Sequence, residues 1–161
     1  FIEPIALYPM RDLLEPGDGA WMTCYPGPDQ RIGLQDIGVH GAGSDLAILT
    51  YGNGHYLSRQ AQADLAAQGV QARVIDMRWI APLAEDAIIA AIGARPVLIV
   101  DECRRSGGQA EALMALLQER GIKGYARLTA EDSFIATGPA YAATLPSRES
   151  IVAAAHSLLG R

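Results

Sequence analysis

The sequence predicts an α/β fold in which helices cover both faces of a largely parallel sheet. From residue 45 onward, short apolar runs of strand length alternate with segments that have the apolar spacing of a helix. Strands and helices that alternate at this length form right-handed crossovers between parallel strands. The chain has 161 residues, of which 50% are hydrophobic, which is enough for one substantial core and too little for two.

The predicted strands are short, nearly continuous apolar runs, as expected for strands buried on both faces of a sheet. In chain order they span residues 45–51, 70–77, 97–101 and 125–129. The run at 97–101 gives the clearest signal, because a charged, glycine-rich turn is expected directly after it, from Asp101 to Gly108. The run at 125–129 is the weakest.

The predicted helices carry apolar side chains at helical spacing. They span residues 56–68, 86–92, 110–120 and 148–159. Gly69, Gly93 and Gly121 stand directly after the first three helices, where a glycine commonly ends a helix. Ser147 is expected to cap the last helix with only half of a capping box, because Ser150 stands where that motif has Glu or Gln.

Residues 1–44 form a different kind of segment, rich in turns, which we interpret as a connection that precedes an α/β domain at 45–161. Three clusters of Gly and Pro, which interrupt helices and strands, lie in it: Pro16-Gly17-Asp18-Gly19, Pro26-Gly27-Pro28-Asp29 and Gly41-Ala42-Gly43. A stretch this long without secondary structure is unusual in a compact domain, so we expect it to pack on something. Trp21 and Tyr25 need an apolar surface to cover them, and we expect a neighbouring domain to supply it.

The composition limits the classes of partner. The formal net charge is -5, and Lys123 is the only lysine, so nucleic acid is not expected as a partner. No apolar run approaches the ~20 residues of a membrane helix, and no signal peptide is recognisable, so we expect a cytoplasmic or organelle-matrix protein. Cys24 and Cys103 are interpreted as ordinary thiols that form neither a disulfide framework nor a zinc site.

Catalytic motifs are scarce. Neither the Gly-x-Ser-x-Gly turn of acyl-transfer enzymes nor a Walker loop occurs. His40, His55 and His156 are isolated along the chain, and no two are four residues apart, so no metal site is predicted. We therefore expect no catalytic, cofactor-binding or metal-binding residue in this chain.

The turn Gly52-Asn53-Gly54 follows a predicted strand and opens a predicted helix. Asp76 ends the next strand, where a dinucleotide fold places its ribose-binding acid. The third glycine of that fingerprint is replaced by Leu57, and any parallel α/β fold needs a tight glycine turn here, so we favour a plain turn over nucleotide binding. His55 lies in this turn and is the one histidine expected to line a pocket.

A dense charged cluster, Asp101, Glu102, Arg104 and Arg105, follows the strand at 97–101. The amides of Ser106-Gly107-Gly108 would project from a helix N-terminus, which allows an anion or effector pocket. The alternative, which we favour, is that the two acids pair with Arg78, Arg104 or Arg105 on a solvated or interdomain surface. The candidate effector or interface residues are Gly52, Gly54, His55, Asp76, Arg78, Asp101, Glu102, Arg104, Arg105, Gly107 and Gly108.

Several segments together carry a family resemblance. They are, in order, Phe1-Ile2-Glu3-Pro4, Tyr51-Gly52-Asn53-Gly54, Asp76–Leu83, Asp101–Gly108 and Thr129–Ile135. From Phe1 to Ile151 the chain resembles the C-terminal domain of the transketolase family, above all the beta-type part of thiamine-diphosphate-dependent 2-oxo acid dehydrogenases. Ala84 and Ala136 depart from the family pattern, which usually has Asp after Pro-Leu and often has Pro after Phe-Ile.

The resemblance implies a three-layer α/β/α fold with a five-stranded mixed sheet whose first strand runs against the others. We place that antiparallel strand at residues 35–39. The opening segment is similar to the end of a pyrimidine-binding domain, so we expect such a domain to precede this chain.

For the parent enzyme, the resemblance implies thiamine diphosphate and Mg²⁺ as cofactors, decarboxylation of a 2-oxo acid, and transfer of the acyl group to a lipoyl acyltransferase. This domain would assemble the enzyme: it would contact the pyrimidine- and diphosphate-binding domains, the acyltransferase core and a second copy of itself in a homodimer. Alone it is expected to bind no cofactor and to have no activity. Whether the parent is fused or has two subunits stays open, as does the substrate.

Two alternatives remain. One is a self-standing nucleotide- or effector-binding module, and the other is the same domain of transketolase or of a deoxyxylulose phosphate synthase. Gly17-Asp18-Gly19 is also similar to the start of the thiamine-diphosphate metal motif, in which an Asp and a downstream Asn hold magnesium. The single asparagine is Asn53, and no apolar strand precedes the motif, so we interpret it as a turn.

Overall fold

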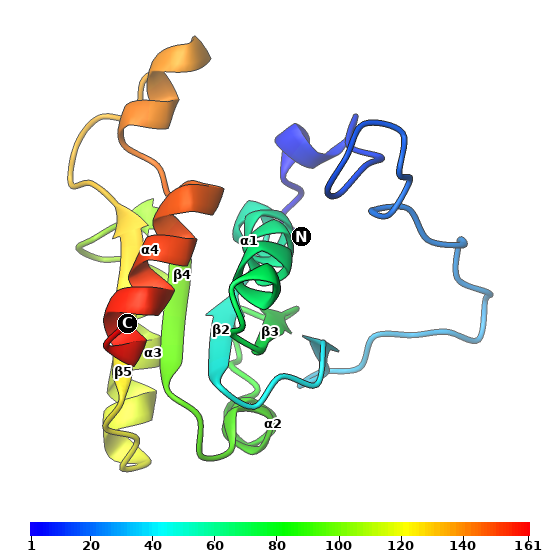
Figure 1. Cartoon of the computed structure of the whole chain (residues 1–161). Coiled ribbons are helices and arrows are strands. Elements are labelled where there is room, and N and C mark those ends of the chain that lie inside the picture. Colours follow the sequence, from blue (N-terminus) through cyan, green and yellow to red (C-terminus); the bar gives the residue numbers. More distant parts are fainter.

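The computed structural model describes residues 1–161 (Figure 1). Its strands are β1 (Ile37–His40), β2 (Leu46–Thr50), β3 (Ala72–Met77), β4 (Val97–Arg104) and β5 (Tyr125–Ala130). Its α-helices are α1 (Asn53–Ala67), α2 (Glu85–Ile92), α3 (Gln109–Glu119) and α4 (Arg148–Leu159). Two short 3₁₀ helices, η1 (Ile5–Leu7) and η2 (Gly138–Ala143), lie outside the sheet layers.

The five strands form one mixed sheet in the order β1-β3-β2-β4-β5. β1 is antiparallel to β3, with Ile37 opposite Met77, and the other neighbours are parallel. The predicted fold class is therefore confirmed, including the antiparallel first strand. That strand begins two residues later than expected, because Gln35 has a positive φ of 73° and belongs to the preceding turn.

Helices cover both faces of the sheet, as Figure 1 shows: α1 and α4 lie side by side on one face, and α2 and α3 lie on the other. The side chains of β2 are all buried: Leu46 and Ile48 face α1, whereas Ala47 and Leu49 face α2 and α3. A strand covered on both faces favours apolar residues along its length, and in β2 only Thr50 at the end is polar, which explains the continuous apolar run in the sequence. Burial of each large aliphatic side chain stabilises the fold by about 1.5–3 kcal/mol.

β4 is longer than the sequence indicated. It continues to Arg104, with a register shift against β5 between Asp101 and Arg104, so the turn expected from Asp101 begins four residues later, at Arg105. The cause is tertiary, because β5 continues to Ala130 and offers backbone partners to the polar end of β4. Glu102 consequently belongs to a strand and not to a loop.

The start of α4 carries a complete capping box, whereas only half of one was predicted. The Ser150 amide donates to Ser147 Oγ at 3.2 Å, and the Ser147 amide donates to Ser150 Oγ at 2.8 Å. A serine hydroxyl can therefore accept the bond that Glu or Gln usually accepts. Arg148 in the same turn holds both carboxylate oxygens of Asp64 and so joins α4 to α1.

The N-terminal segment packs in part on this domain, as expected. Leu13 is buried, and Tyr56 of α1 donates a hydrogen bond to the Asp12 carbonyl at 2.9 Å. The Trp21 ring contacts the rings of Tyr56 and His55, so α1 supplies the surface that we expected from another domain. Tyr25, in contrast, is 95% exposed. None of the helices has the length and apolar character needed to span a bilayer.

Candidate functional site

The candidate residues gather at the edge of the sheet where the parallel strands end, the edge at which open α/β sheets commonly bind ligands. One group surrounds the connection from β4 to α3: Asp101, Glu102, Arg104, Arg105, Gly107 and Gly108. The other lies around the start of α1 and the end of β3: Gly52, Gly54, His55, Asp76 and Arg78. Hydrogen bonds from Tyr51 to Asp101 and from Asn53 to Glu102 join the two groups.

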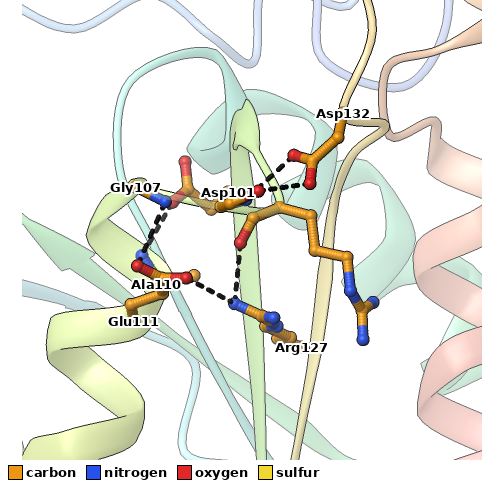
Figure 2. Close-up of polar contacts among 8 residues, drawn as sticks. Asp101, Gly107, Ala110, Glu111, Arg127 and Asp132 are labelled. Carbon is orange, nitrogen blue, oxygen red and sulfur yellow. Dashed lines mark hydrogen bonds and ion pairs between the residues drawn. The ribbon is translucent and has the colours of Figure 1, made fainter.

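Asp101 is the buried centre of the first group, with 1% of its surface exposed. Its Oδ1 accepts from the Tyr51 hydroxyl at 2.6 Å and from the Cys103 amide at 2.8 Å. Its Oδ2 accepts from the Ala110 amide at 2.9 Å, at the start of α3 (Figure 2). The carboxylate thus fixes β4, the end of β2 and the N-terminus of α3 relative to one another.

Tyr51 acts as a fixed donor in this network. Burial raises the pKa of Tyr51 above its ordinary value, and the hydrogen bond to Asp101 raises it further. The hydroxyl therefore keeps its proton at neutral pH. Its oxygen also lies 3.4 Å from Cys103 Sγ.

Two amides of the β4–α3 loop, those of Ser106 and Gly107, are already paired within the chain (Figure 2). Asp132 accepts from both the amide and the hydroxyl of Ser106, and Glu111 Oε2 accepts from the Gly107 amide at 3.1 Å. Arg127 of β5 donates to the Arg105 carbonyl at 2.9 Å. A cleft of about 690 Å³ lies beside this loop. An anion entering it would have to displace carboxylates from their donors, so the arrangement disfavours an anion pocket.

The ion pairs that we favoured from the sequence are wrong. Neither Asp101 nor Glu102 lies in a salt bridge, and the side chains of Arg104 and Arg105 are exposed without one. Asp101 is turned into the core, where polar donors satisfy it, whereas the arginines point to solvent. The charges of this segment are therefore separated by burial and not neutralised in pairs.

Glu102 is partly buried and accepts a hydrogen bond from Asn53 Nδ2 at 2.7 Å. Burial raises the pKa of Glu102, the Asn53 hydrogen bond lowers it, and the charge of Asp101 raises it. The pKa of Glu102 is higher in the folded chain than in the unfolded chain. At pH values between these two pKa values, the folded chain therefore binds more protons than the unfolded chain. The contribution of Glu102 to stability is thus present at low pH and is lost as pH rises through its folded-state pKa.

We expect Glu102→Gln to be stabilised relative to the wild-type chain at neutral pH, because glutamine keeps the acceptor for Asn53 without a buried charge. The difference should shrink when the pH falls below the ordinary pKa of Glu, where both side chains are neutral. Urea unfolding at a series of pH values measures this difference. Glu131→Gln, at an exposed glutamate, is the control. A difference that does not vary with pH would contradict the interpretation.

The second group contains an unexpected cluster. The ring centroids of His40 and His55 are 4.6 Å apart, and His55 Nδ1 lies 3.9 Å from Asp76 Oδ2. These histidines are far apart along the chain, but the antiparallel pairing of β1 with β3, in which Gly38 lies opposite Asp76, brings His40 close to Asp76. One donor atom from each of the three residues lies within 4.8 Å of the others, so they are candidate metal ligands. His156 lies apart from them, on α4, and contacts Gln68 at 2.6 Å.

Burial controls ionisation in this cluster. Burial lowers the pKa of His55 to about 3, and the charges of His40, Arg59 and Arg78 add to the effect. Burial also lowers the pKa of His40 and raises the pKa of Asp76. Both imidazoles are consequently neutral at physiological pH, with His40 held by Arg59, whose Nη1 lies 2.8 Å from His40 Nδ1.

The glycine turn before α1 serves packing. Gly52 has a φ of 57°, which favours glycine, and Gly54 is buried against the end of β2. A Cβ at Gly54 would lie 2.5 Å from Thr50 Oγ1, so only glycine lets α1 approach β2 this closely. In a dinucleotide fingerprint the third glycine has this packing role, and here the second glycine has it. This contact supports the plain-turn interpretation.

The Gly17-Asp18-Gly19 segment is also a turn. Asp18 accepts from the backbone amides of Leu13, Leu14, Glu15 and Ala20, and these bonds hold its pKa well below its ordinary value. Asn53, the other half of the supposed metal motif, donates to Glu102 instead. These contacts support the interpretation as a plain turn.

These features define a three-layer α/β/α domain with an antiparallel edge strand and a hydrogen-bonded network at its strand ends. The family comparison narrows that class. The family model described as "Transketolase, C-terminal domain" matches residues 27–151, and the chain belongs to this family.

Individual relatives agree with this assignment. The chain is 29% identical over 139 residues to the pyruvate dehydrogenase E1 component subunit beta of Bacillus subtilis (strain 168), covering 83% of this chain and 43% of the relative. It is 35% identical over 116 residues to 1-deoxy-D-xylulose-5-phosphate synthase 1 of Geobacter metallireducens, covering 68% of this chain and 19% of the relative. The chain thus spans less than half the length of these relatives.

A solved structure shares the fold. It is described as "Split gene transketolase, inactive beta4 tetramer", and it superposes with a TM-score of 0.74 at 23% identity. The match covers 83% of this chain and 44% of that one.

Proposed function

We propose that this domain is the assembly domain of a thiamine-diphosphate-dependent 2-oxo acid dehydrogenase. The relationship to a pyruvate dehydrogenase E1 beta subunit supports this class of parent enzyme. The parent would use thiamine diphosphate and Mg²⁺, held by its pyrimidine- and diphosphate-binding domains, and would pass an acyl group to a lipoyl acyltransferase core. The residues of this chain would hold the catalytic domains and the subunits together.

One observation carries the proposal: large apolar side chains are exposed on two segments that lie outside the sheet layers. On the N-terminal segment they include Phe1, Ile2, Ile5, Tyr8, Tyr25, Ile32 and Leu34. On the segment around η2, which projects beyond the sheet in Figure 1, Phe134 is 90% exposed and Tyr141 is 51% exposed. Apolar side chains gathered in this way are typical of interaction surfaces.

We extend the proposal to the candidate residues of the β4–α3 connection, which suit an interface better than an effector pocket. Arg104 and Arg105 are exposed and free of salt bridges, so they can meet acidic groups of a neighbouring domain. Phe134 lines the same cleft as Arg104. An apolar anchor beside cations is the usual composition of a protein interface.

The two cysteines favour a reducing compartment as the location of the parent enzyme. Cys24 and Cys103 are both free and exposed, which suits a reducing compartment such as a bacterial cytoplasm or an organelle matrix. A second copy of the chain is a further partner in this proposal, as in a homodimer of E1 beta-type subunits.

Phe134→Asp is expected to weaken association with the catalytic domains of the parent dehydrogenase at least about tenfold, because it places a charge in the apolar centre of the interface. The 161-residue chain is titrated calorimetrically with the separately produced pyrimidine- and diphosphate-binding domains. Restored reductive acylation of a lipoyl domain is the second measurement. Lys123→Glu, at an exposed residue before β5 and so at the opposite end of that strand from Phe134, should leave both measurements unchanged.

Two outcomes would refute this function. One is full activity of the catalytic domains without the chain, and the other is binding of Phe134→Asp as tight as that of the wild-type chain. The relationship to a deoxyxylulose phosphate synthase favours the same domain in a transketolase-like enzyme as the second candidate. In that case the reconstituted enzyme would form a ketose phosphate and would not acylate lipoamide.

A further inference from the structure

Three side chains from separate elements meet beside the edge strand of the sheet. His40 comes from β1, Asp76 from β3 and His55 from the first turn of α1. One ligand atom of each lies within 4.8 Å of the other two, and His55 Nδ1 is 3.9 Å from Asp76 Oδ2. From these separations, small movements of the side chains would bring all three atoms to the distance of about 2.0–2.2 Å at which they coordinate a metal ion.

The surroundings leave room for an ion and limit access of water. Gly38, beside Asp76 in the sheet, has no side chain: a Cβ there would lie 3.3 Å from Asp76 Oδ2 and 3.4 Å from His40 Nε2. These two atoms therefore face one small space. The side chain of His55 is only 13% exposed and that of Asp76 is 20% exposed, and the Trp21 ring packs on His55 with 5.3 Å between centroids.

The donor set has a specific chemistry. Two imidazole nitrogens and one carboxylate oxygen are the ligands that Zn²⁺ and related first-row ions prefer, with a fourth position left for water. His55 would coordinate through Nδ1, the ring atom that lies 3.9 Å from Asp76 Oδ2. We propose that His40, His55 and Asp76 form a binding site for one divalent transition-metal ion such as Zn²⁺.

Arg59 is the internal competitor of the metal. Arginine can only donate, so the 2.8 Å contact from Arg59 Nη1 means that His40 Nδ1 accepts and that the ring proton lies on Nε2, which faces Asp76. A metal ion bound at Nε2 takes the place of that proton. The neutral ring must then carry its proton on Nδ1, and a protonated Nδ1 cannot accept a hydrogen bond from Arg59. Metal binding must therefore release the guanidinium, and Arg59→Gln should bind the ion more tightly.

The site would fasten the edge of the sheet. β1 touches the rest of the sheet only through β3, and an ion held by His40, Asp76 and His55 would connect β1, β3 and α1 directly. Because an ion that binds the folded chain raises its stability, Zn²⁺ should raise the melting temperature of the chain.

The test is a calorimetric titration of the 161-residue chain with Zn²⁺, in a Cys24→Ser, Cys103→Ser background that removes competing thiols. We expect one saturable site. His40→Gln, His55→Gln and Asp76→Asn should each weaken binding at least about tenfold, since even partners outside the ligand shell cost 10–100-fold. His156→Gln, at the third histidine, is the matched control and should bind like the background. Circular dichroism establishes that each variant is folded.

A second measurement needs no change at a ligand. Co²⁺ or Ni²⁺ bound at this site should quench the fluorescence of Trp21, which contacts His55, far more than that of Trp79. Trp79→Phe should retain the quenching and Trp21→Phe should lose it. The proposal would be overturned by any of three results: quenching that is lost in Trp79→Phe and kept in Trp21→Phe, no saturable binding, or equal Zn²⁺ affinity in His40→Gln and His156→Gln.

Discussion

Replacement of Asp101 by alanine is expected to destabilise the fold by about 3–5 kcal/mol, the cost of leaving a buried charged network without one partner. The substitution removes the acceptor of three hydrogen bonds, from Tyr51, Cys103 and Ala110. Each donor would stay buried or partly buried without a partner. Urea unfolding, followed by circular dichroism, measures the free energy of unfolding.

Asp101→Asn separates the roles of shape and charge. The side chain keeps one acceptor oxygen, and the Tyr51 hydroxyl can turn to accept from the new amide group, so we expect a loss of about 1–2 kcal/mol. Asp132→Asn is the exposed control, because Asp132 accepts from the same loop in contact with water. If Asp101→Ala were no less stable than this control, the carboxylate would not organise the strand ends.

The arrangement of the fold was predictable because local pattern and tertiary burial agree. The continuous apolar run from Leu46 to Leu49 is buried on both faces, as a central parallel strand must be. The boundaries were less predictable. β4 continues through polar residues to Arg104 only because β5 lies beside it, and no local pattern contains that information.

The candidate site was predictable in position but not in its contacts. The sequence pointed to two separate groups of residues at strand ends, and the structure brings them together; the partners of Asp101 are Tyr51 after β2 and Ala110 of α3 in place of the expected arginines. His40 was missed because only the pairing of β1 with β3 places it near Asp76. One signal was available in the sequence: the first amides of the predicted helix after Gly108 needed an acceptor, and Asp101 was a nearby carboxylate.

Gly54→Val is expected to destabilise the chain by about 3 kcal/mol, at the upper end of the usual cost of overpacking a core. The glycine is buried where α1 crosses the end of β2. Its Cβ would lie 2.5 Å from Thr50 Oγ1 and 3.5 Å from the Val100 carbonyl, so a branched side chain must push the helix away from the strand. Thermal and urea unfolding measure the loss.

Gly27→Ala is the matched control, because Gly27 has no positive φ and nothing within 4 Å of its Cβ position. It should change stability by less than about 0.5 kcal/mol. Thr50→Ala should recover part of the loss in Gly54→Val, since it removes the atom closest to the new side chain; an unchanged loss in the double variant would refute the packing explanation. Because Gly54→Val is expected to displace α1, a loss of nucleotide binding in this variant would not show that the turn itself binds the nucleotide. A nucleotide-binding hypothesis for this turn therefore has to be tested with Asp76→Ala, compared at equal fraction folded.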